Sequence, residues 1–354
     1  MRGWPLRHPD LFWCLQREDI GFDGNSVLIK KFLFFIVLSV ALAAAGITFI
    51  AKQPIIGAGV QPLEFAIKPG SSVRSTAGQI ADAGVPVNPY VFEVLARATG
   101  KAPRLKAGHY ELKPGTTPLG LIDQLVRGEF AQESLAIIEG WSFRQMREAV
   151  AAHPALKHDT VALSDRELLA RITSDHTAPE GLFFPDTYRF AKGSSDLQIY
   201  RQAYALLQKR LNEAWARRDP SVPYKSPYEA LIMASIIEKE TGQRSERNMI
   251  SAVFVNRLKR GMLLQTDPTV IYGMGDKFQG NIRKRDLETD TPYNTYTRAG
   301  LPPTPIALPG SESIEAALNP SKSDVLYFVA RGNGTSEFSN NLADHNRAVN
   351  KYQR

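Results

Sequence analysis

The residues best suited to chemistry lie at the end of one apolar segment. Residues 230–237 read ALIMASII, and Glu238 and Glu240 follow with one lysine between them. Eight apolar or small residues in a row leave no polar face, so we expect a helix that is buried all round. The helix dipole and desolvation both oppose an anion at a helix C-terminus, which raises the pKa of a carboxyl placed there. A carboxyl that stays protonated near neutral pH is what a general acid must be.

Spacing alone does not decide between the two acids. Glu238 shares a helix face with Ala234 and Ser235, whose small side chains leave space for a ligand, whereas Glu240 shares a face with Met233. The alternative is that both acids are the solvated end of a core helix, because charged residues at helix ends are mostly exposed.

Other chemistries fail on residue type or spacing. The six histidines form no His-Glu-x-x-His pair, and no Gly-x-Ser-x-Gly, Walker or Gly-x-Gly-x-x-Gly motif occurs. Cys14 is the only cysteine, which excludes an intramolecular disulfide and a cysteine-held zinc or iron–sulfur site. We therefore predict carboxylate chemistry with no metal and no cofactor.

Composition is that of a globular protein of 354 residues, with 43% apolar and 22% charged residues, and its length suggests two domains. The net charge of +7 suits an acidic polymer as partner without selecting one. No dense basic stripe is visible, so nucleic-acid binding is not predicted.

A membrane segment is predicted near the N-terminus. Residues 32–51 carry no charge and are long enough to span a bilayer as a helix. Lysine and arginine residues are more frequent before this segment than after it, which places the tail 1–31 in the cytoplasm and residues 53–354 outside. A cleaved signal peptide is the alternative because residues 43–45 are all alanine, but the apolar stretch continues through Ile50.

The exported part is predicted to be α+β, beginning with a linker over residues 52–62. Two strand–turn–helix units start at Phe65 and Tyr110, and a weaker third copy covers residues 136–142. Because a strand and a helix cannot bury a core alone, the first units should form one small domain over residues 63–135.

The remainder, residues 136–354, is predicted to be mainly helical with a few short strands. Helices are expected at 143–151, 165–173, 195–217, 226–241 and 245–260. A proline-rich stretch at 286–310 should form a stiff loop. A hairpin over 325–330 and 337–339 precedes a last helix capped by Asn340 or Asn341.

Several motifs in one order resemble the membrane-anchored endolytic murein transglycosylases, the murein lytic transglycosylase G family. The resemblance covers the anchor and nearly all of the exported part. It rests on residues 234–241 (ASIIEKET), 180–188 (EGLFFPDTY), 253–258 (VFVNRL), 262–273 (MLLQTDPTVIYG), 293–296 (YNTY) and 300–306 (GLPPTPI).

The resemblance implies an activity and a place in the cell. It makes Glu238 the catalytic residue and the glycan strand of peptidoglycan the substrate, cut between N-acetylmuramic acid and N-acetylglucosamine to leave 1,6-anhydro ends. It also implies a LysM-like fold for residues 63–135, a single-pass protein of the cell inner membrane with a periplasmic catalytic domain, and a role in cell wall assembly and strand-length control. Peptidoglycan synthases are the candidate protein partners.

Supporting roles are predicted for four further residues. Gln265, Asn294 and Tyr296 are expected to hydrogen-bond the N-acetyl groups or to stabilise the oxocarbenium-like charge, with a role in shaping turns as the alternative for each. Glu180 is expected to line the cleft, or else to be a loop acid or cap.

Two other functions stay open. One is a hydrolytic glycosidase in which Glu238 is the acid and Glu240 or Glu180 the base, since ordinary glycosidases need two carboxylates. The other is a non-catalytic wall-binding scaffold.

Overall fold

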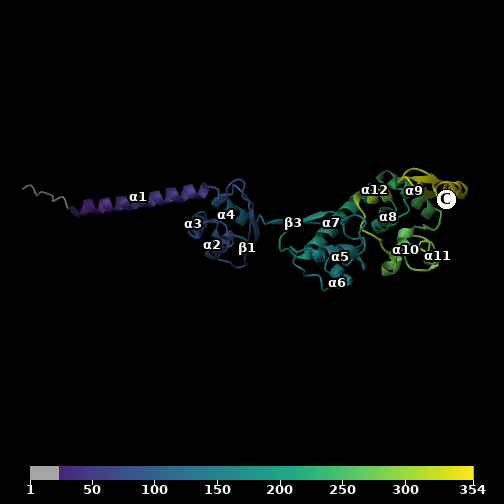
Figure 1. Ribbon diagram of the computed structural model, residues 1–354, viewed down its shortest axis with the longest axis horizontal. Coiled ribbons are helices and arrows are strands. Elements are labelled where there is room, and N and C mark those ends of the chain that lie inside the picture. Colours follow the sequence, from purple (N-terminus) through teal and green to yellow (C-terminus); the bar gives the residue numbers. More distant parts are fainter. Residues whose placement is uncertain (1–23, 354) are drawn as a thin grey trace, which may run out of the picture. The chain divides into compact units, whose positions relative to one another are not determined.

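The computed structural model of the protein describes residues 24–353, and the side chains from residue 28 onward (Figure 1). The chain divides into two compact units. The first holds the chain up to Lys106 together with Leu112–Gly128, and the second holds Ala107–Glu111 and the chain from Glu129 on. The domain boundaries predicted at residues 62 and 135, and the LysM-like assignment, stay predictions. Most of the predicted tail 1–31 lies outside the described residues, and Cys14 lies outside them as well.

The predicted apolar helix is confirmed as α1 (Gly24–Lys52), which begins before the predicted residue 32. Its segment Leu28–Lys52 has a mean hydropathy of 2.6 and is long enough to cross a membrane. Large apolar side chains are exposed along it, with Phe32 at 67%. An exposed apolar helix of this length is consistent with a single-pass anchor or with a signal sequence.

The first unit contains the predicted strand–turn–helix pattern. Strand β1 (Leu63–Ile67) leads into α2 (Val73–Asp82), which Ser72 caps by accepting from the Ser75 amide. Helix α3 (Pro89–Ala98) follows, and α4 (Pro118–Arg127) is capped in the same way by Thr117. Apolar residues of these helices form the buried core, among them Ile80, Phe92, Leu121 and Leu125.

Strand β2 (Gly108–Leu112) completes the second predicted strand–turn–helix unit, but the third copy differs from the prediction. The strand of this third copy is β3 (Gln132–Ala136), which ends at residue 136, where the predicted strand was to begin. Strand β3 pairs antiparallel with β4 (Thr187–Ala191). Ser142 then starts α5 (Phe143–Ala152) through a capping box with Gln145.

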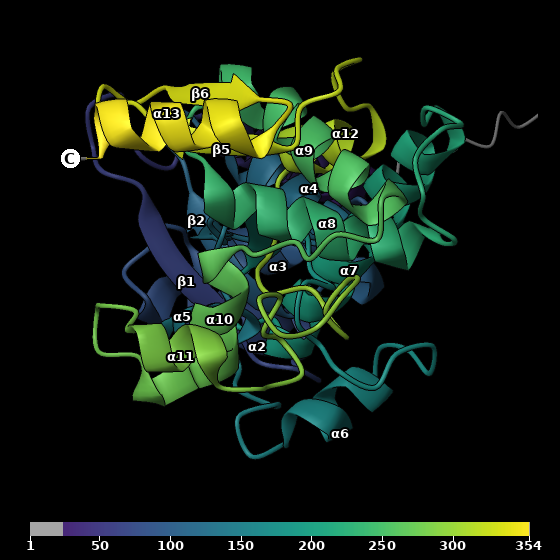
Figure 2. The ribbon, with the colours of Figure 1, turned by 90° about the vertical axis from the view of Figure 1, so that its right-hand side faces the viewer.

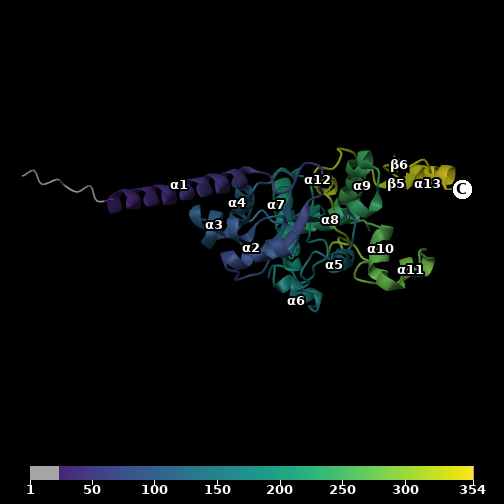
Figure 3. The same ribbon diagram turned by 60° about the vertical axis from the view of Figure 1, so that its left-hand side comes forward.

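The core of the second unit is built from helices. The central helix α8 (Pro227–Glu240) packs against α12 (Ser311–Leu318) and α7 (Asp196–Ala216), and α9 (Arg247–Lys259) packs against α12. Their buried faces form one apolar cluster (Figures 1 and 3). The helices of this unit after α5 are α6 (Asp165–Ala170), α7 (Asp196–Ala216), α8 (Pro227–Glu240), α9 (Arg247–Lys259), α10 (Asp267–Met274), α11 (Lys284–Glu288) and α12 (Ser311–Leu318).

The predicted helices agree with α5 to α9 within a few residues, whereas α12 was not predicted. The proline-rich stretch 286–310 is irregular after the last residues of α11, as predicted. The C-terminus also agrees with the prediction. Strands β5 (Tyr327–Ala330) and β6 (Ser336–Ser339) form an antiparallel hairpin, and α13 (Leu342–Tyr352), capped by Asn341, lies along it (Figure 2).

Candidate active site

Helix α8 positions the two predicted acids. Ser226 caps its N-terminus and Pro227 occupies the first helical position, where a missing N–H costs nothing. Residues 230–237 are all buried, as the sequence predicted, and the last turn carries Glu238 and Glu240. The two carboxyl groups have separate surroundings.

Glu238 lies against the start of α12. Its Oε2 accepts hydrogen bonds from the Gly310 amide at 3.0 Å and the Ser313 hydroxyl at 2.7 Å. Its Oε1 lies 3.4 Å from the Arg247 guanidinium, and the side chain is only 6% exposed. Amide, hydroxyl and guanidinium donors at a helix N-terminus together suit a carboxylate anion. Glu238 therefore fixes α12 to α8.

A second acid crowds the same helix start. A side chain at Gly310 would place its Cβ only 1.9 Å from Glu139 Oε1, so the exposed Glu139 side chain would have to move to admit it. Burial raises the pKa of Glu139, and the nearby charges of Glu238 and Glu312 raise it further. Glu312 in turn pairs with Arg247 at 2.6 Å. The negative charges of this cluster of glutamates are thus offset by Arg247 and by the hydrogen-bond donors at the start of α12.

Glu240 lies in a different place, on the wall of a cavity of 520 Å³. Its Oε2 accepts a hydrogen bond of 2.6 Å from the Thr266 hydroxyl. Burial raises the pKa of Glu240, and the negative charge of Asp267 adds to the effect, while the Thr266 bond and Arg257 oppose it. No hydrogen bond from the described residues reaches its other oxygen. Glu240 thus combines a raised pKa with access to a cavity.

Two of the predicted binding residues line this same cavity. Gln265 has a φ of +50°, and it is the only described residue other than glycine with a positive φ. That conformation costs roughly 1–2 kcal/mol, and such strain gathers at functional positions. Tyr296 lines the cavity as well, and its hydroxyl donates to Asp267 at 2.6 Å. The structure thus brings Gln265 and Tyr296 together with Glu240.

Asn294 does not reach the cavity, because its side chain is fully buried. Its amide nitrogen lies 2.9 Å from the carbonyl oxygen of Leu287 and 2.7 Å from that of Thr289. Its Oδ1 accepts from the Tyr296 amide at 2.8 Å. The alternative of a turn-shaping role therefore fits Asn294 better, and through this last bond it positions Tyr296.

Glu180 is also apart from the cavity. Its carboxyl accepts from the Phe143 amide at 2.9 Å and from the Tyr272 hydroxyl at 3.2 Å. Burial raises its pKa to about 7. These contacts join α5 to α10, which makes Glu180 a buried acid between elements.

Two features of the site were missed at the sequence level. One is His345, which was not among the predicted site residues and which lines the cavity and stacks on Tyr327 with ring centroids 5.0 Å apart. The other is the hydrogen bond from Thr266 to Glu240, for which the neighbouring residues carry no signal. Thr266 is also the N-cap residue of α10. Within residues 28–353, no group of three or more His, Cys, Asp or Glu side chains could hold a metal ion.

Fold and site define an α+β protein with a long apolar N-terminal helix and a cavity lined by a part-buried carboxyl of raised pKa. The chain belongs to the YceG-like family, which matches residues 65–351. It is similar to a protein of Bacillus subtilis named endolytic murein transglycosylase, with 34% identity over 81% of this chain and 83% of the relative.

Two further proteins are similar to this chain. A Streptococcus pneumoniae protein of the same name is 27% identical over 91% of this chain and 64% of its own length. A crystal structure of a yceG-like protein from Listeria monocytogenes covers 81% of this chain and 99% of that chain, with 32% identity and a TM-score of 0.51.

Proposed function

We propose that this protein is a membrane-anchored endolytic transglycosylase that cuts peptidoglycan glycan strands between N-acetylmuramic acid and N-acetylglucosamine. The names of its relatives support the substrate. The observation that carries the chemistry is the part-buried Glu240 carboxyl, with a raised pKa, on the wall of a 520 Å³ cavity.

We assign the proton transfers to Glu240. In the neutral form favoured by its raised pKa, it donates a proton to the glycosidic oxygen as the bond to C1 breaks. The muramyl C6 hydroxyl then attacks C1 and returns a proton to the carboxylate, which yields the 1,6-anhydro end. One carboxyl suffices because the nucleophile belongs to the substrate and is held close, so no water needs activation. Gln265 and Tyr296 are placed to contact the sugar beside it.

Glu238, the residue predicted from the sequence, is the second candidate. Its carboxylate is occupied by Gly310, Ser313 and Arg247, which supports a structural role over proton donation. The variants Glu240→Gln and Glu238→Gln separate the two assignments when purified glycan strands are digested and the products are weighed by mass spectrometry.

We expect Glu240→Gln to lose 1,6-anhydro products and to keep its melting temperature. Glu238→Gln should retain the products but melt at a lower temperature, because a charged contact to α12 is weakened. Loss of products in a stably folded Glu238→Gln, with activity kept in Glu240→Gln, would return the role to Glu238. Products heavier by one water would indicate a hydrolytic glycosidase, and binding without products would indicate a scaffold.

We further propose that α1 is a retained single-pass anchor of the inner membrane, with the N-terminus in the cytoplasm and residues 53–354 in the periplasm. The exposed apolar surface of α1 and the basic residues before it support this topology. Cys14, the only cysteine, should react with a membrane-impermeant thiol reagent only after the inner membrane is opened. Absence of residue 14 from the mature protein would establish a cleaved signal instead. Peptidoglycan synthases as partners stay a prediction from the family resemblance.

A further inference from the structure

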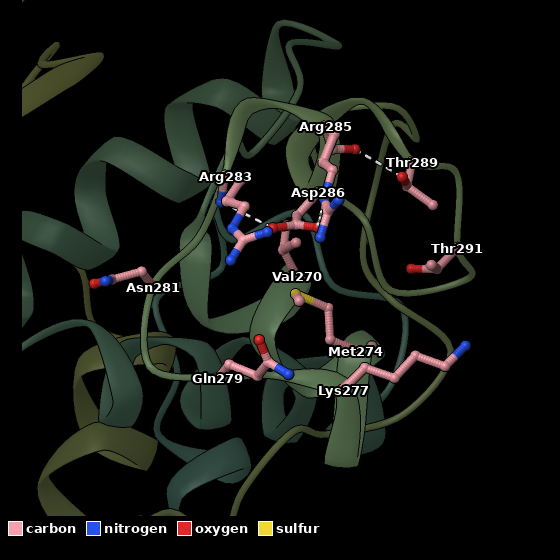
Figure 4. A pocket seen from close by; sticks show the side chains of 11 residues that line it. Val270, Met274, Lys277, Gln279, Asn281, Arg283, Arg285, Asp286, Thr289 and Thr291 are labelled. Carbon is pink, nitrogen blue, oxygen red and sulfur yellow. Dashed lines mark hydrogen bonds and ion pairs between the residues drawn. The ribbon is translucent and has the colours of Figure 1, made fainter.

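A second cavity, of 440 Å³, lies between α10 and α11 (Figure 4). Three cationic side chains line it, Lys277, Arg283 and Arg285, against one carboxylate, Asp286. In Figure 4 the Arg283 and Arg285 guanidinium groups lie on either side of that carboxylate. Gln279 and Asn281 add amide groups to the rim. The lining therefore keeps an excess of positive charge together with neutral hydrogen-bonding groups, which favours an anionic, polar ligand.

The floor of this cavity is built by close packing. A Cβ at Gly273, on α10, would lie 2.8 Å from Thr291 Oγ1 and 3.2 Å from Tyr293 Cβ, so the loop after α11 sits directly on the helix. Arg144 of α5 forms an exposed ion pair with Asp276, in the turn that follows α10. The cavity is therefore bounded by packed elements on these sides.

This second cavity, called the basic cavity from here on, adjoins the cavity that Glu240 lines. Helix α10 carries Asp267 in the wall of one and Met274 in the wall of the other. Seven residues at ~1.5 Å rise separate these positions by about 10 Å along the helix. Asn294 also joins the two walls, because its amide bonds the Thr289 carbonyl on one side while its Oδ1 holds the Tyr296 amide on the other.

We propose that the basic cavity binds a carboxylate of the peptide stems attached to the glycan strand. The inference rests on the proposed function, since it names the part of that substrate which this second cavity would bind. The sugars and their N-acetyl groups are neutral, so the anionic groups of a peptide-bearing strand are the carboxylates of its stems. Arginine binds carboxylates through paired N–H donors, and two arginines in one cavity suit that chemistry.

Binding to the full-length protein in detergent tests the proposal. The Glu240→Gln variant is used so that turnover does not consume the ligand. Fluorescently labelled strands with intact stems are compared with strands from which an amidase has removed the stems. We expect stem-bearing strands to bind about tenfold more tightly, the effect of about one well-formed ionic hydrogen-bonded contact, and this advantage to shrink at high salt.

The variant Arg283→Gln/Arg285→Gln, in the same background, should lower the affinity for stem-bearing strands to that of stem-free strands. The matched control Lys209→Gln/Lys284→Gln removes two exposed charges outside the cavity lining and should keep the preference. Equal binding of stem-bearing and stem-free strands would overturn the proposal. An equal loss of affinity for both kinds of strand in the arginine variant would also overturn it. That result would point to the muramyl lactyl carboxylate, which stem removal exposes. Because binding is measured without turnover, failure of the proposed activity would show separately, as missing 1,6-anhydro products.

Discussion

The Thr266 hydroxyl donates a 2.6 Å hydrogen bond to Glu240 Oε2, and this bond works against the burial that raises the pKa of the carboxyl. A donor to the ionised form stabilises that form, so the hydroxyl limits how far the pKa rises. The pair therefore sets the balance between giving a proton and taking one back, and both steps are needed in the proposed reaction.

The variant Thr266→Val tests this balance. Without the hydroxyl, the pKa of Glu240 should rise further, because a hydrogen bond to a charged group contributes about 1.5–3 kcal/mol. The alkaline limb of the rate against pH should therefore move up by about one pH unit or more. Thr269→Val is the control, since Thr269 is equally buried and bonds Thr266 and Thr295 rather than Glu240. An unchanged limb in Thr266→Val would mean that Glu240 does not govern the profile.

Glu180 should make stability fall with rising pH. Its folded pKa of about 7 lies above the ordinary value of 4.5, so the folded state holds this proton more tightly than the unfolded state does. The stabilisation is complete below about pH 4.5 and is lost as the pH rises through 7, with a total of at most about 3 kcal/mol. Glu180→Gln keeps an acceptor for the Phe143 amide and cannot ionise, so its unfolding free energy should change less between pH 5 and pH 8. Parallel pH curves for the wild type and the variant would contradict this assignment, and exposed Glu288→Gln is the control.

The sequence predicted those features that depend on neighbouring residues. Asn341 caps the last helix as expected, and the buried run 230–237 forms the core helix, because caps and apolar runs are local properties. The partners of the two acids were not predictable in this way. Ser313 reaches Glu238 across 75 positions and Thr266 reaches Glu240 across 26 positions, and nothing in the local pattern records such contacts.

For the same reason, the sequence did not show which of the two glutamates lines a cavity. Both glutamates end one helix, and the residues that occupy Glu238 belong to α12, a helix without a strong sequence signal of its own. Tertiary packing therefore distinguished two carboxyls that the sequence left equivalent in chemistry. The buried side chain of Asn294 illustrates the same limit, since a motif predicts that a residue matters without showing which atoms it contacts.

Replacing Asn294 by alanine should loosen the loop that carries Tyr296. The change removes the side-chain bonds to the Leu287 and Thr289 carbonyls and to the Tyr296 amide, at roughly 1 kcal/mol each and more where a buried group is left without a partner. We expect the unfolding free energy to fall by about 3 kcal/mol, and KM for glycan strands to rise because Tyr296 is no longer held. Asn281→Ala, which removes an exposed amide, should leave stability unchanged. A fall in stability with no change in KM would separate Asn294 from substrate binding.

The effects of substituting Gly310 and Glu139 on the unfolding free energy should be coupled. A methyl group at position 310 would overlap the Glu139 carboxyl, so Gly310→Ala must displace that side chain or the start of α12, and with it the amide that bonds Glu238. Because the Glu139 side chain is exposed and can move, we expect a cost of about 1 kcal/mol, the low end of the range for overpacking. Glu139→Ala alone should cost little, because it removes an acid whose raised pKa marks an unfavourable site for a charge. In the double variant the overlap is gone, so most of the loss caused by Gly310→Ala should be recovered, and the two changes should be clearly non-additive in thermal unfolding. Additive losses would mean that contact with Glu139 does not explain the effect of the Gly310 substitution.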